Sequence, residues 1–324
     1  MTLQLRKFEF RSQVAGPRLL ITGCVHGDEF EPIAAIRRLV NLFAHSAGAV
    51  SGFRGTVTLI PVVNESAFLR GHRCADDGLD LARTSPGRSD GSVTEQTAWA
   101  LSDAIRSADY YIDLHTGGTE LSVFPLAGYM LHRNPDVLAT QRRMAQAFNL
   151  SVVWGTSAEL DGRSLSVARD ANVPAIYCEY LGSATCDPAG VEAYVDGCLN
   201  VMSELGMLDR EHPKSRITHF VEDAQPNAGH MQVCNPSPVT GYFDSHVQLG
   251  DAVRPGDLLG TIYPLDGSVP AVVKATQSGI VLVLRTFPRV RAAESVGVVL
   301  ELQSETIGER HASACRYKNE VPEG

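Results

Sequence analysis

Residues of the kinds that bind metal ions stand at the ends of strand-like runs in this chain. The apolar run Leu19–Val25 stops at His26-Gly27-Asp28-Glu29 and passes into a helical pattern, and the run Tyr110–Leu114 stops at His115. An open α/β sheet usually keeps its active site at the tips of its strands. Two imidazoles and a carboxylate are the ligand type that holds a catalytic zinc and leaves one position open for water. The sequence therefore predicts a zinc site formed by His26, Glu29 and His115.

Spacing alone does not support this prediction. About one His-x-x-acid match is expected by chance in a chain with 10 histidines and 37 acidic residues among 324 positions. His219-Phe220-Val221-Glu222 is such a match, and we interpret it as surface or linker because no strand end or turn glycine frames it. His26 and Glu29 differ in context, since Gly27 allows a tight strand-to-helix turn that lets both side chains face one point.

Strand and helix patterns alternate from Arg18 to about Leu208. Short strands interleaved with helices predict an α/β domain with a mixed, mostly parallel sheet flanked by helices. The polar segment 70–92 has no periodicity, and a loop of this length more often carries function than not. The predicted strands are 18–25, 56–63, 110–114, 151–154 and 175–179, and the predicted helices are 32–44, 94–106, 135–148, 164–171 and 189–205.

The pattern changes after Leu208. Residues 211–229 are polar and indicate a linker or a strand pair crossing between domains, and from about Gly241 short β runs predict a smaller all-β domain. The chain thus divides into residues 1–210 and 211–324.

Segments 247–257 and 273–279 of the second part resemble the lipoyl/biotinyl-like barrel-sandwich fold. A carrier role would need a lysine at an exposed hairpin tip, whereas Lys274 falls inside a β run, so a structural or lid-forming role is favoured. The predicted β runs are 241–243, 247–250, 258–263, 269–275, 279–284 and 296–302.

Composition excludes several classes of function. A net charge of −9 argues against a nucleic-acid-binding surface. The sequence contains no run of about 18 apolar residues, the length needed to span a membrane. Seven cysteines without a C-x-x-C pair suggest neither a disulfide framework nor a thiolate metal site. The N-terminal residues lack the apolar core of a signal peptide, so we expect a cytoplasmic protein that acts on a small molecule. A homo-oligomer is compatible with this expectation.

Hydrolysis of an acyl bond needs further groups besides a metal. Glu179 ends the apolar run 174–178 and is a candidate general base, although a structural salt bridge is an open alternative. Arg73 and Arg83 flank the irregular loop and suit an oxyanion and a substrate carboxylate. They are equally well explained as solvated loop charges, and Arg70 competes for the same role.

Five motifs follow one another along the chain: His26-Gly27-Asp28-Glu29, Asn64 to Arg73 (Asn-x-x-Ala-Phe-x-x-Gly-x-Arg), Asp80-Leu81-Ala82-Arg83, Asp113-Leu114-His115 and Glu179. Taken in this order, they resemble the succinylglutamate desuccinylase/aspartoacylase family of the zinc-carboxypeptidase superfamily. The match covers roughly residues 17 to 205. The β domain also looks like the C-terminal domain of many bacterial members.

The resemblance implies a zinc-carboxypeptidase-like fold and a zinc-dependent amidohydrolase that removes an acetyl- or succinyl-type group from an N-acylated amino acid. It implies one Zn²⁺ on His26, Glu29 and His115, Glu179 as general base, Arg73 at the scissile carbonyl and Arg83 at the substrate carboxylate. Asn64, Arg163 and Arg169 are further candidates for substrate contact.

One position departs from the family pattern. Ala82 replaces the asparagine of the usual Asp-Leu-Asn-Arg motif, and a methyl group cannot donate that hydrogen bond. Relatives that act on N-acetylated diamino acids, as in ectoine breakdown, therefore become relevant. A metallocarboxypeptidase acting on peptides and a metal-free binding protein are the alternative functions.

Overall fold

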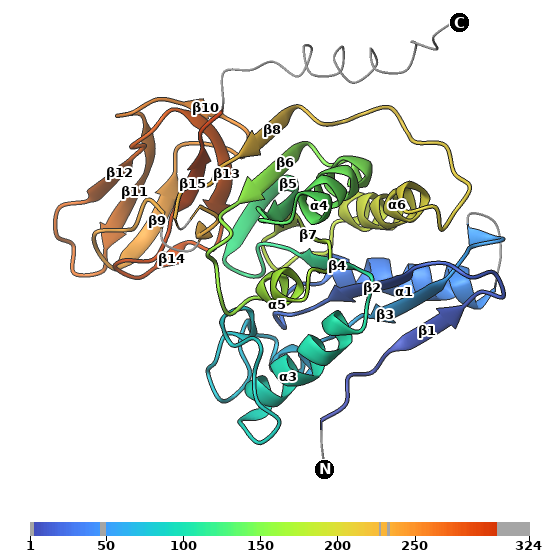
Figure 1. Ribbon diagram of the computed structural model, residues 1–324. Helices are drawn as coiled ribbons and strands as arrows, with labels where there is room; N and C mark the ends of the chain where they lie inside the picture. The colour runs from blue at the N-terminus through green and yellow to red at the C-terminus, as the bar shows by residue number, and fades with distance from the viewer. Residues whose placement is uncertain (1–2, 46–49, 227, 232–233, 303–324) are drawn as a thin grey trace, which may run out of the picture.

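A large mixed sheet with helices on both faces carries a smaller β-sandwich at one edge (Figure 1). The structure is a computed structural model and describes residues 3–45, 50–226, 228–231 and 234–302. The large sheet has the order β1-β3-β2-β4-β7-β5-β13-β10, with β6 also on β5, β8 on β6 and β15 on β13. Its strands are β1 Phe8–Arg11, β2 Arg18–Gly23, β3 Thr56–Ile60, β4 Tyr110–His115, β5 Leu121–Met130, β6 Val152–Thr156, β7 Ala175–Gly182, β8 His219–Glu222, β10 Ala252–Val253, β13 Gly279–Arg285 and β15 Gly297–Leu300.

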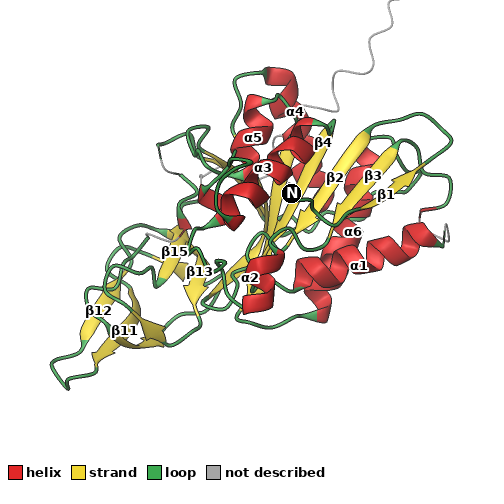
Figure 2. Ribbon diagram, turned by 90° about the horizontal axis from the view of Figure 1, so that it is seen from below, coloured by secondary structure: helices red, strands yellow, loops and turns green. Residues whose placement is uncertain are grey.

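The helices cover both faces of the sheet, as the view in Figure 2 shows. Alternate strand residues point to opposite faces, so Leu19 and Ile21 of β2 join one apolar core while Leu20 joins the other. The first core is closed by α1 Glu31–Ala44, α4 Pro135–Phe148 and α6 Pro188–Glu204, and the second by α3 Val93–Arg106 and α5 Ser164–Asp170. The α/β prediction with a mixed, mostly parallel sheet is confirmed, because β3, β2, β4 and β7 run parallel.

Parallel pairing places the predicted site residues at one edge of the sheet. The pairing of β4 with β7 puts His115 directly opposite Glu179. Gly23, the last residue of β2, pairs with Leu114, so the turn that carries His26 begins beside His115. The short helices α2 Glu65–Arg70 and η2 Leu81–Arg83 follow β3 and bring the arginine-bearing loop to the same edge.

The strand β5 was absent from the sequence prediction although it has ten residues. It pairs antiparallel with β7 and parallel with β6. Pro125 interrupts its apolar pattern, and the register with β7 shifts between Val123 and Leu126, where a bulge accommodates the proline. Gly128 also weakens the pattern, yet it is required because a Cβ would lie 2.3 Å from the Tyr177 ring.

The interpretation of His219–Glu222 as surface or linker is wrong. These residues form β8, which pairs parallel with β6. Glu222 accepts hydrogen bonds from the Tyr129 hydroxyl at 2.5 Å and from Arg142 Nε and Nη2 at 2.7 and 2.8 Å. The strand is recognised by these contacts with distant elements, which a four-residue pattern does not contain.

We expect Glu222→Ala to lower the free energy of unfolding by about 1–3 kcal/mol, because the buried Tyr129 hydroxyl loses its acceptor. Urea denaturation followed by circular dichroism measures the change. Glu192→Ala is the matched control, since Glu192 pairs with Arg38 at the surface, and it should cost less than about 1 kcal/mol. Equal losses in the two variants would contradict the role assigned to Glu222.

The C-terminal β-sandwich packs two sheets against each other. One is the antiparallel sheet β12-β11-β9-β14, and the other consists of β10, β13 and β15. Phe243, Ile262 and Val281 are among the residues that fill the space between them. The strands of the separate sheet are β9 Gly241–Ser245, β11 Leu258–Pro264, β12 Ala271–Lys274 and β14 Arg289–Val290. The predicted barrel-sandwich region is therefore present, and Lys274 pairs with Leu258 within a ladder instead of standing at a hairpin tip.

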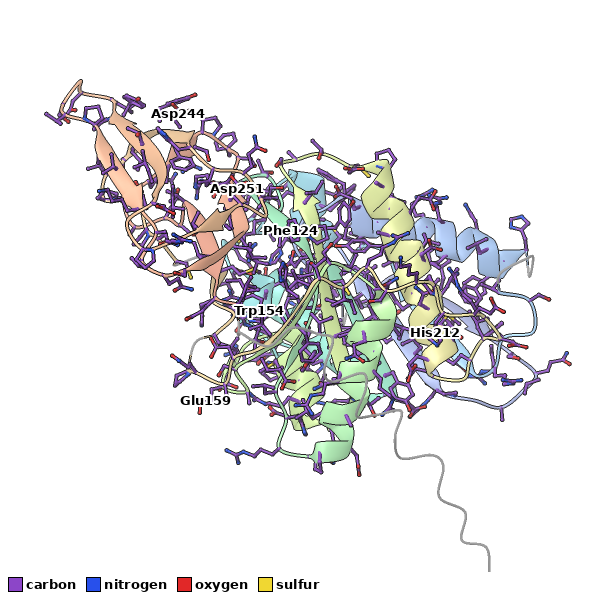
Figure 3. The ribbon with its side chains drawn as sticks, turned by 90° about the horizontal axis from the view of Figure 1, so that it is seen from above. Phe124, Trp154, Glu159, His212, Asp244 and Asp251 are labelled. Carbon is purple, nitrogen blue, oxygen red and sulfur yellow. The ribbon has the colours of Figure 1, made fainter. Side chains whose placement is uncertain are left out.

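The predicted strand 247–250 is a turn. Gly250 has φ +85°, and the Gln248 amide donates to Asp251 at 2.8 Å, so the segment reverses direction before β10. A Cβ on Gly250 would meet the Phe124 ring of β5 at 2.9 Å. Figure 3 shows Asp251 and Phe124 toward the main body of the protein and Asp244 farther out on the sandwich.

The large sheet continues across the predicted domain boundary at residue 210. β8 pairs with β6, and β13 pairs with β5 through Val283 and Val123. The division into residues 1–210 and 211–324 stays a prediction, and its last segment, 303–324, lies outside the described residues. Among the helices that the structure describes, none combines the length and apolar character required to cross a membrane.

Candidate active site

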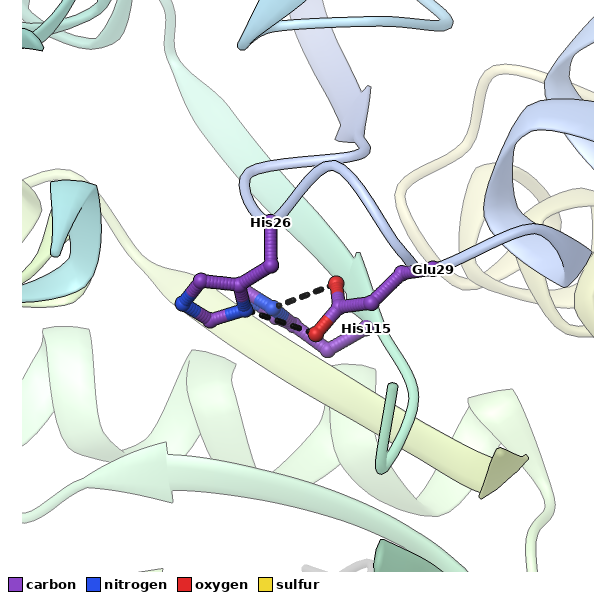
Figure 4. Close-up of side chains that lie close together, drawn as sticks. All are labelled: His26, Glu29 and His115. Carbon is purple, nitrogen blue, oxygen red and sulfur yellow. Dashed lines mark hydrogen bonds and ion pairs between the residues drawn. The ribbon is translucent and has the colours of Figure 1, made fainter. Parts of the chain in front are cut away.

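His26, Glu29 and His115 converge on one point at the strand ends (Figure 4). Glu29 lies between the two rings, with Oε1 at 2.7 Å from His26 Nδ1 and Oε2 at 3.2 Å from His115 Nδ1. One nitrogen or oxygen from each residue lies within 4.8 Å of the others. All three residues are buried. The convergence that the strand-end pattern predicted is therefore present.

The turn that carries His26 and Glu29 depends on close packing against α2. The positive φ in this turn belongs to Cys24, at 54°, whereas Gly27 is needed for space, because a Cβ there would lie 2.0 Å from the Ala67 carbonyl carbon. Asn64 secures the same contact: its side-chain oxygen accepts from the Ala67 backbone amide at 3.1 Å, and its backbone N–H donates to Cys24 O at 3.0 Å. Asn64 therefore caps α2 and holds the turn.

Two further carboxylates hold the outer nitrogens of the histidine rings. Asp80 Oδ1 lies 3.2 Å from His26 Nε2, and Asp113 Oδ2 lies 3.1 Å from His115 Nε2. Asp113 is fully buried and also accepts hydrogen bonds from Thr22 and Ser164. Such partners orient metal-binding imidazoles and leave the opposite nitrogen available as a ligand. The sequence prediction quoted both aspartates within motifs but assigned them no role, and their closeness to histidines in those motifs was the available signal.

Glu179 is a buried carboxylate without a hydrogen-bond donor for one of its oxygens. Oε2 has no partner among the described residues. Burial raises the pKa of Glu179 to about 8, since the attraction of His115 only partly offsets it. In Glu29 burial acts in the same direction, but the two histidines outweigh it and lower the pKa to about 2. The two carboxylates thus have different chemistry: Glu29 is a permanent anion, and Glu179 is suited to exchange a proton near neutral pH.

Three arginines line the pocket in front of Glu179, together with Ala82 and Tyr177. Arg73 donates to Asp80 Oδ2 from Nε at 3.2 Å and from Nη2 at 2.9 Å, which fixes its guanidinium beside the histidines. Arg83 lies at a more exposed position. Arg163 has a buried Nη2 without a partner among the described residues, and burial, followed by the charge of Arg83, lowers its pKa to about 10. These groups form a cationic wall that suits an anionic substrate.

Two candidate residues do not line this pocket. Arg169 donates to Ala158 O, Asp161 and Asp170 at 2.5 to 2.8 Å, so its donors are used within the surrounding loops. Asn64 points into the α2 turn as described above. The structure therefore brings together His26, Glu29, His115, Glu179, Arg73, Arg83 and Arg163, and leaves Asn64 and Arg169 outside the pocket lining.

The residues at the convergence point fit a divalent cation. Glu29 and Asp113, which are buried, and the half-buried Asp80 surround the two imidazoles with negative charge. Asp113 and Glu29 raise the pKa of His115 well above its usual value although burial opposes this. A cluster of this sign and burial favours a bound cation. Two imidazoles and one carboxylate, with their outer nitrogens held by carboxylates, are the donor set expected for a catalytic zinc.

The fold and this site define the class of protein to which the chain belongs. Residues 15–205 match the Succinylglutamate desuccinylase/Aspartoacylase catalytic domain. The match covers more than half of the chain, so the chain belongs to this family of deacylases.

Individual relatives agree with this assignment. The chain is 29% identical over 296 residues to N-alpha-acetyl-L-2,4-diaminobutyric acid deacetylase of Halomonas elongata, covering 89% of this chain and 83% of the relative. The product-bound structure of the ectoine utilization protein EutE (DoeB) from Ruegeria pomeroyi is 26% identical, with a TM-score of 0.79 over 90% of this chain and 87% of that one. The succinylglutamate desuccinylase/aspartoacylase structure from Rhodobacter sphaeroides, at 24% identity, shows the same fold with a TM-score of 0.81 over 93% of this chain and 89% of that one.

Proposed function

We propose that this protein is a zinc-dependent amidohydrolase that removes an acyl group, of acetyl or succinyl type, from an N-acylated amino acid. The observation that carries the proposal is the position of Glu179, a buried carboxylate with an unpartnered oxygen, beside the His26–Glu29–His115 cluster in an arginine-lined pocket. A carboxylate buried for structural reasons alone would normally have a hydrogen-bond donor for each of its oxygens.

Each residue of the site has a separate role in the proposed hydrolysis. His26, Glu29 and His115 would hold zinc, which when bound lowers the pKa of water and polarises a carbonyl group. Glu179 removes the proton of the attacking water and later transfers it to the leaving amine nitrogen. Arg73 donates to the carbonyl oxygen as negative charge develops there, and its bond to Asp80 keeps the guanidinium in place before substrate binds.

The pocket indicates the substrate class. Arg83 and Arg163 have the planar donor geometry that binds carboxylates, and Arg163 Nη2, which has no partner among the described residues, can donate to such a group. The α-carboxylate of an N-acyl amino acid supplies it. The methyl of Ala82 lines the same pocket, so the amide contact typical of the family is replaced by an apolar one. The Halomonas elongata relative acts on an N-acetylated diamino acid, and we place such compounds first in the test.

The test is a hydrolysis screen with purified protein, monitored by liquid chromatography with and without a chelator. The panel contains N-acetyl-2,4-diaminobutyrate, N-acetylaspartate, N-succinylglutamate and peptides with free C-termini. Chelator-sensitive release of an amino acid from N-acyl compounds supports the proposal. Activity on peptides alone would favour a metallocarboxypeptidase, and a protein without bound metal or activity would favour a binding role. A cytoplasmic location and the absence of nucleic-acid partners stay predictions.

Arg73→Ala should lower kcat/KM by about 10²- to 10³-fold, the usual cost of one oxyanion donor. Steady-state kinetics measure the loss, and elemental analysis checks that zinc stays bound. Arg88→Ala is a suitable control because Arg88 lies in the same irregular loop with its side chain 65% exposed. A loss below about tenfold in the zinc-bound Arg73 variant would remove Arg73 from this role.

A further inference from the structure

The β-sandwich binds the loop that follows His115 through hydrogen bonds and ion pairs. Glu120, in that loop, accepts from Arg289 Nη2 at 2.6 Å and from Arg285 Nη2 at 3.3 Å. Its backbone carbonyl accepts from the amides of Thr286 and Phe287 at 3.0 and 3.2 Å. Side chain and backbone of one residue are thus held by the turn between β13 and β14.

Arg285 is the buried centre of this contact. Its side chain is only 3% exposed, although arginine is rarely buried. Every nitrogen of the guanidinium has a partner: Nε donates to Ser295 O at 2.9 Å, Nη1 to Arg289 O at 3.1 Å, and Nη2 reaches both Glu120 and Glu294 at 3.3 Å. An apolar side chain of similar size would fill the same space without burying a charge. The arginine therefore joins Glu120 to groups of the sandwich, a role that an apolar side chain could not take.

The same loop, residues 116–120, contacts the turn that carries His26 and Glu29. The Thr119 amide donates to Asp28 Oδ2 at 2.8 Å, and Asp28 lies between His26 and Glu29 in the chain. Gly118 has φ +60° and must be glycine, because a Cβ would lie 2.8 Å from the same oxygen of Asp28. The loop also begins at His115 itself. One segment of five residues, 116–120, thus joins His115 to the turn that carries the other two ligands.

The loop touches the end of β7 as well. The Gly117 amide donates to Leu181 O at 2.8 Å, and the Ala184 amide donates to Gly118 O at 3.0 Å. Leu181 follows Glu179 by two residues. Loop 116–120 therefore contacts both the ligand turn and the strand that carries the proposed base.

We propose that Arg285 is a positioning residue for the metal centre. By holding Glu120, it fixes loop 116–120 and through the Thr119–Asp28 bond the relative placement of His115 and the turn of His26 and Glu29. The sandwich is then an integral part of the site, neither a carrier nor a separate lid. The inference rests on the proposed function only in requiring that the three ligands bind zinc.

The experiment measures zinc affinity by competition with a chromophoric chelator. Arg285→Met, which keeps the volume but removes the charge, and Glu120→Gln, which removes only the acceptor charge, should each weaken zinc binding by about 10- to 100-fold, as loss of ligand-orienting partners usually does. Because both changes weaken the same contact, the double variant should lose little more than the stronger single one. Arg285→Lys should recover part of the affinity.

Controls separate positioning from folding and from the proposed function. Arg254→Met changes an exposed arginine of the sandwich and should leave zinc affinity unchanged. Thermal unfolding of each variant shows whether it is folded at the assay temperature, and Glu120→Gln carries the test if Arg285→Met does not fold. Affinities within twofold of the parent in the folded variants would overturn the inference while leaving the proposed function intact. A parent protein that binds no zinc would overturn both.

Discussion

Glu179→Gln is expected to lower kcat by about 10²- to 10⁴-fold while zinc stays bound at about one ion per chain, the range typical of losing a general acid–base group. Glutamine keeps the size and one acceptor of the side chain but cannot take a proton from water. Glu179 is not part of the three-residue ligand cluster, so the metal should be retained. Steady-state kinetics with an N-acyl amino acid and elemental analysis of the same sample measure the two quantities together.

Glu159→Gln is the matched control for this substitution. Glu159 is exposed at the outside of the molecule (Figure 3) and belongs neither to the three-residue cluster nor to the pocket lining. The control should retain the parent activity. A Glu179→Gln enzyme that holds zinc and turns over substrate at a rate close to the parent would exclude Glu179 as the base.

His115→Ala should produce the second large effect, the loss of both zinc and activity. Removing one of three ligands leaves two donors and exposes the buried carboxylates Glu29 and Asp113 to each other without the ring between them. Since the nucleophile depends on the metal, hydrolysis should fall to near the uncatalysed rate. Elemental analysis should find less than about a tenth of an equivalent of zinc per chain, because the two remaining donors bind the ion too weakly to retain it.

The control for His115→Ala is His246→Ala. His246 is exposed in the sandwich and contacts Thr261. It should keep both zinc and activity. Restoration of activity in the parent by zinc after chelation, but not in the His115 variant, would complete the assignment; zinc retention near one equivalent in the variant would refute it.

The convergence of the three candidate ligands was predictable from sequence because it depends on local pattern. His26, Glu29 and His115 each end an apolar run or follow it by one turn, and strands that are neighbours in a parallel sheet place such ends together. The same reasoning located Glu179, which ends the run on β7. The five-motif resemblance pointed to the same residues independently.

Other parts of the fold were not predictable because their signals are not local. Pro125 and Gly128 obscured β5, and the Gly128 position is explained only by the Tyr177 ring on the neighbouring strand. The four residues of β8 form a strand because they pair with β6, and Glu222 is held there by Arg142 and Tyr129, far away in the chain. Arg169 precedes the strand that carries Glu179, but its guanidinium donates hydrogen bonds to Ala158 O and to the Asp161 carboxylate in a neighbouring loop.

The sequence by itself determined the class of fold and the location of the candidate metal-binding residues at strand ends, because strand and helix periodicity depends on residues that are close together in the chain. Only the tertiary structure decided which groups orient those ligands. Asp80 and Asp113 reach the outer nitrogens of the rings, and Arg285 holds Glu120 across 165 positions of chain. Contacts of this kind depend on distances set by the packing of whole elements, and no local pattern contains those distances.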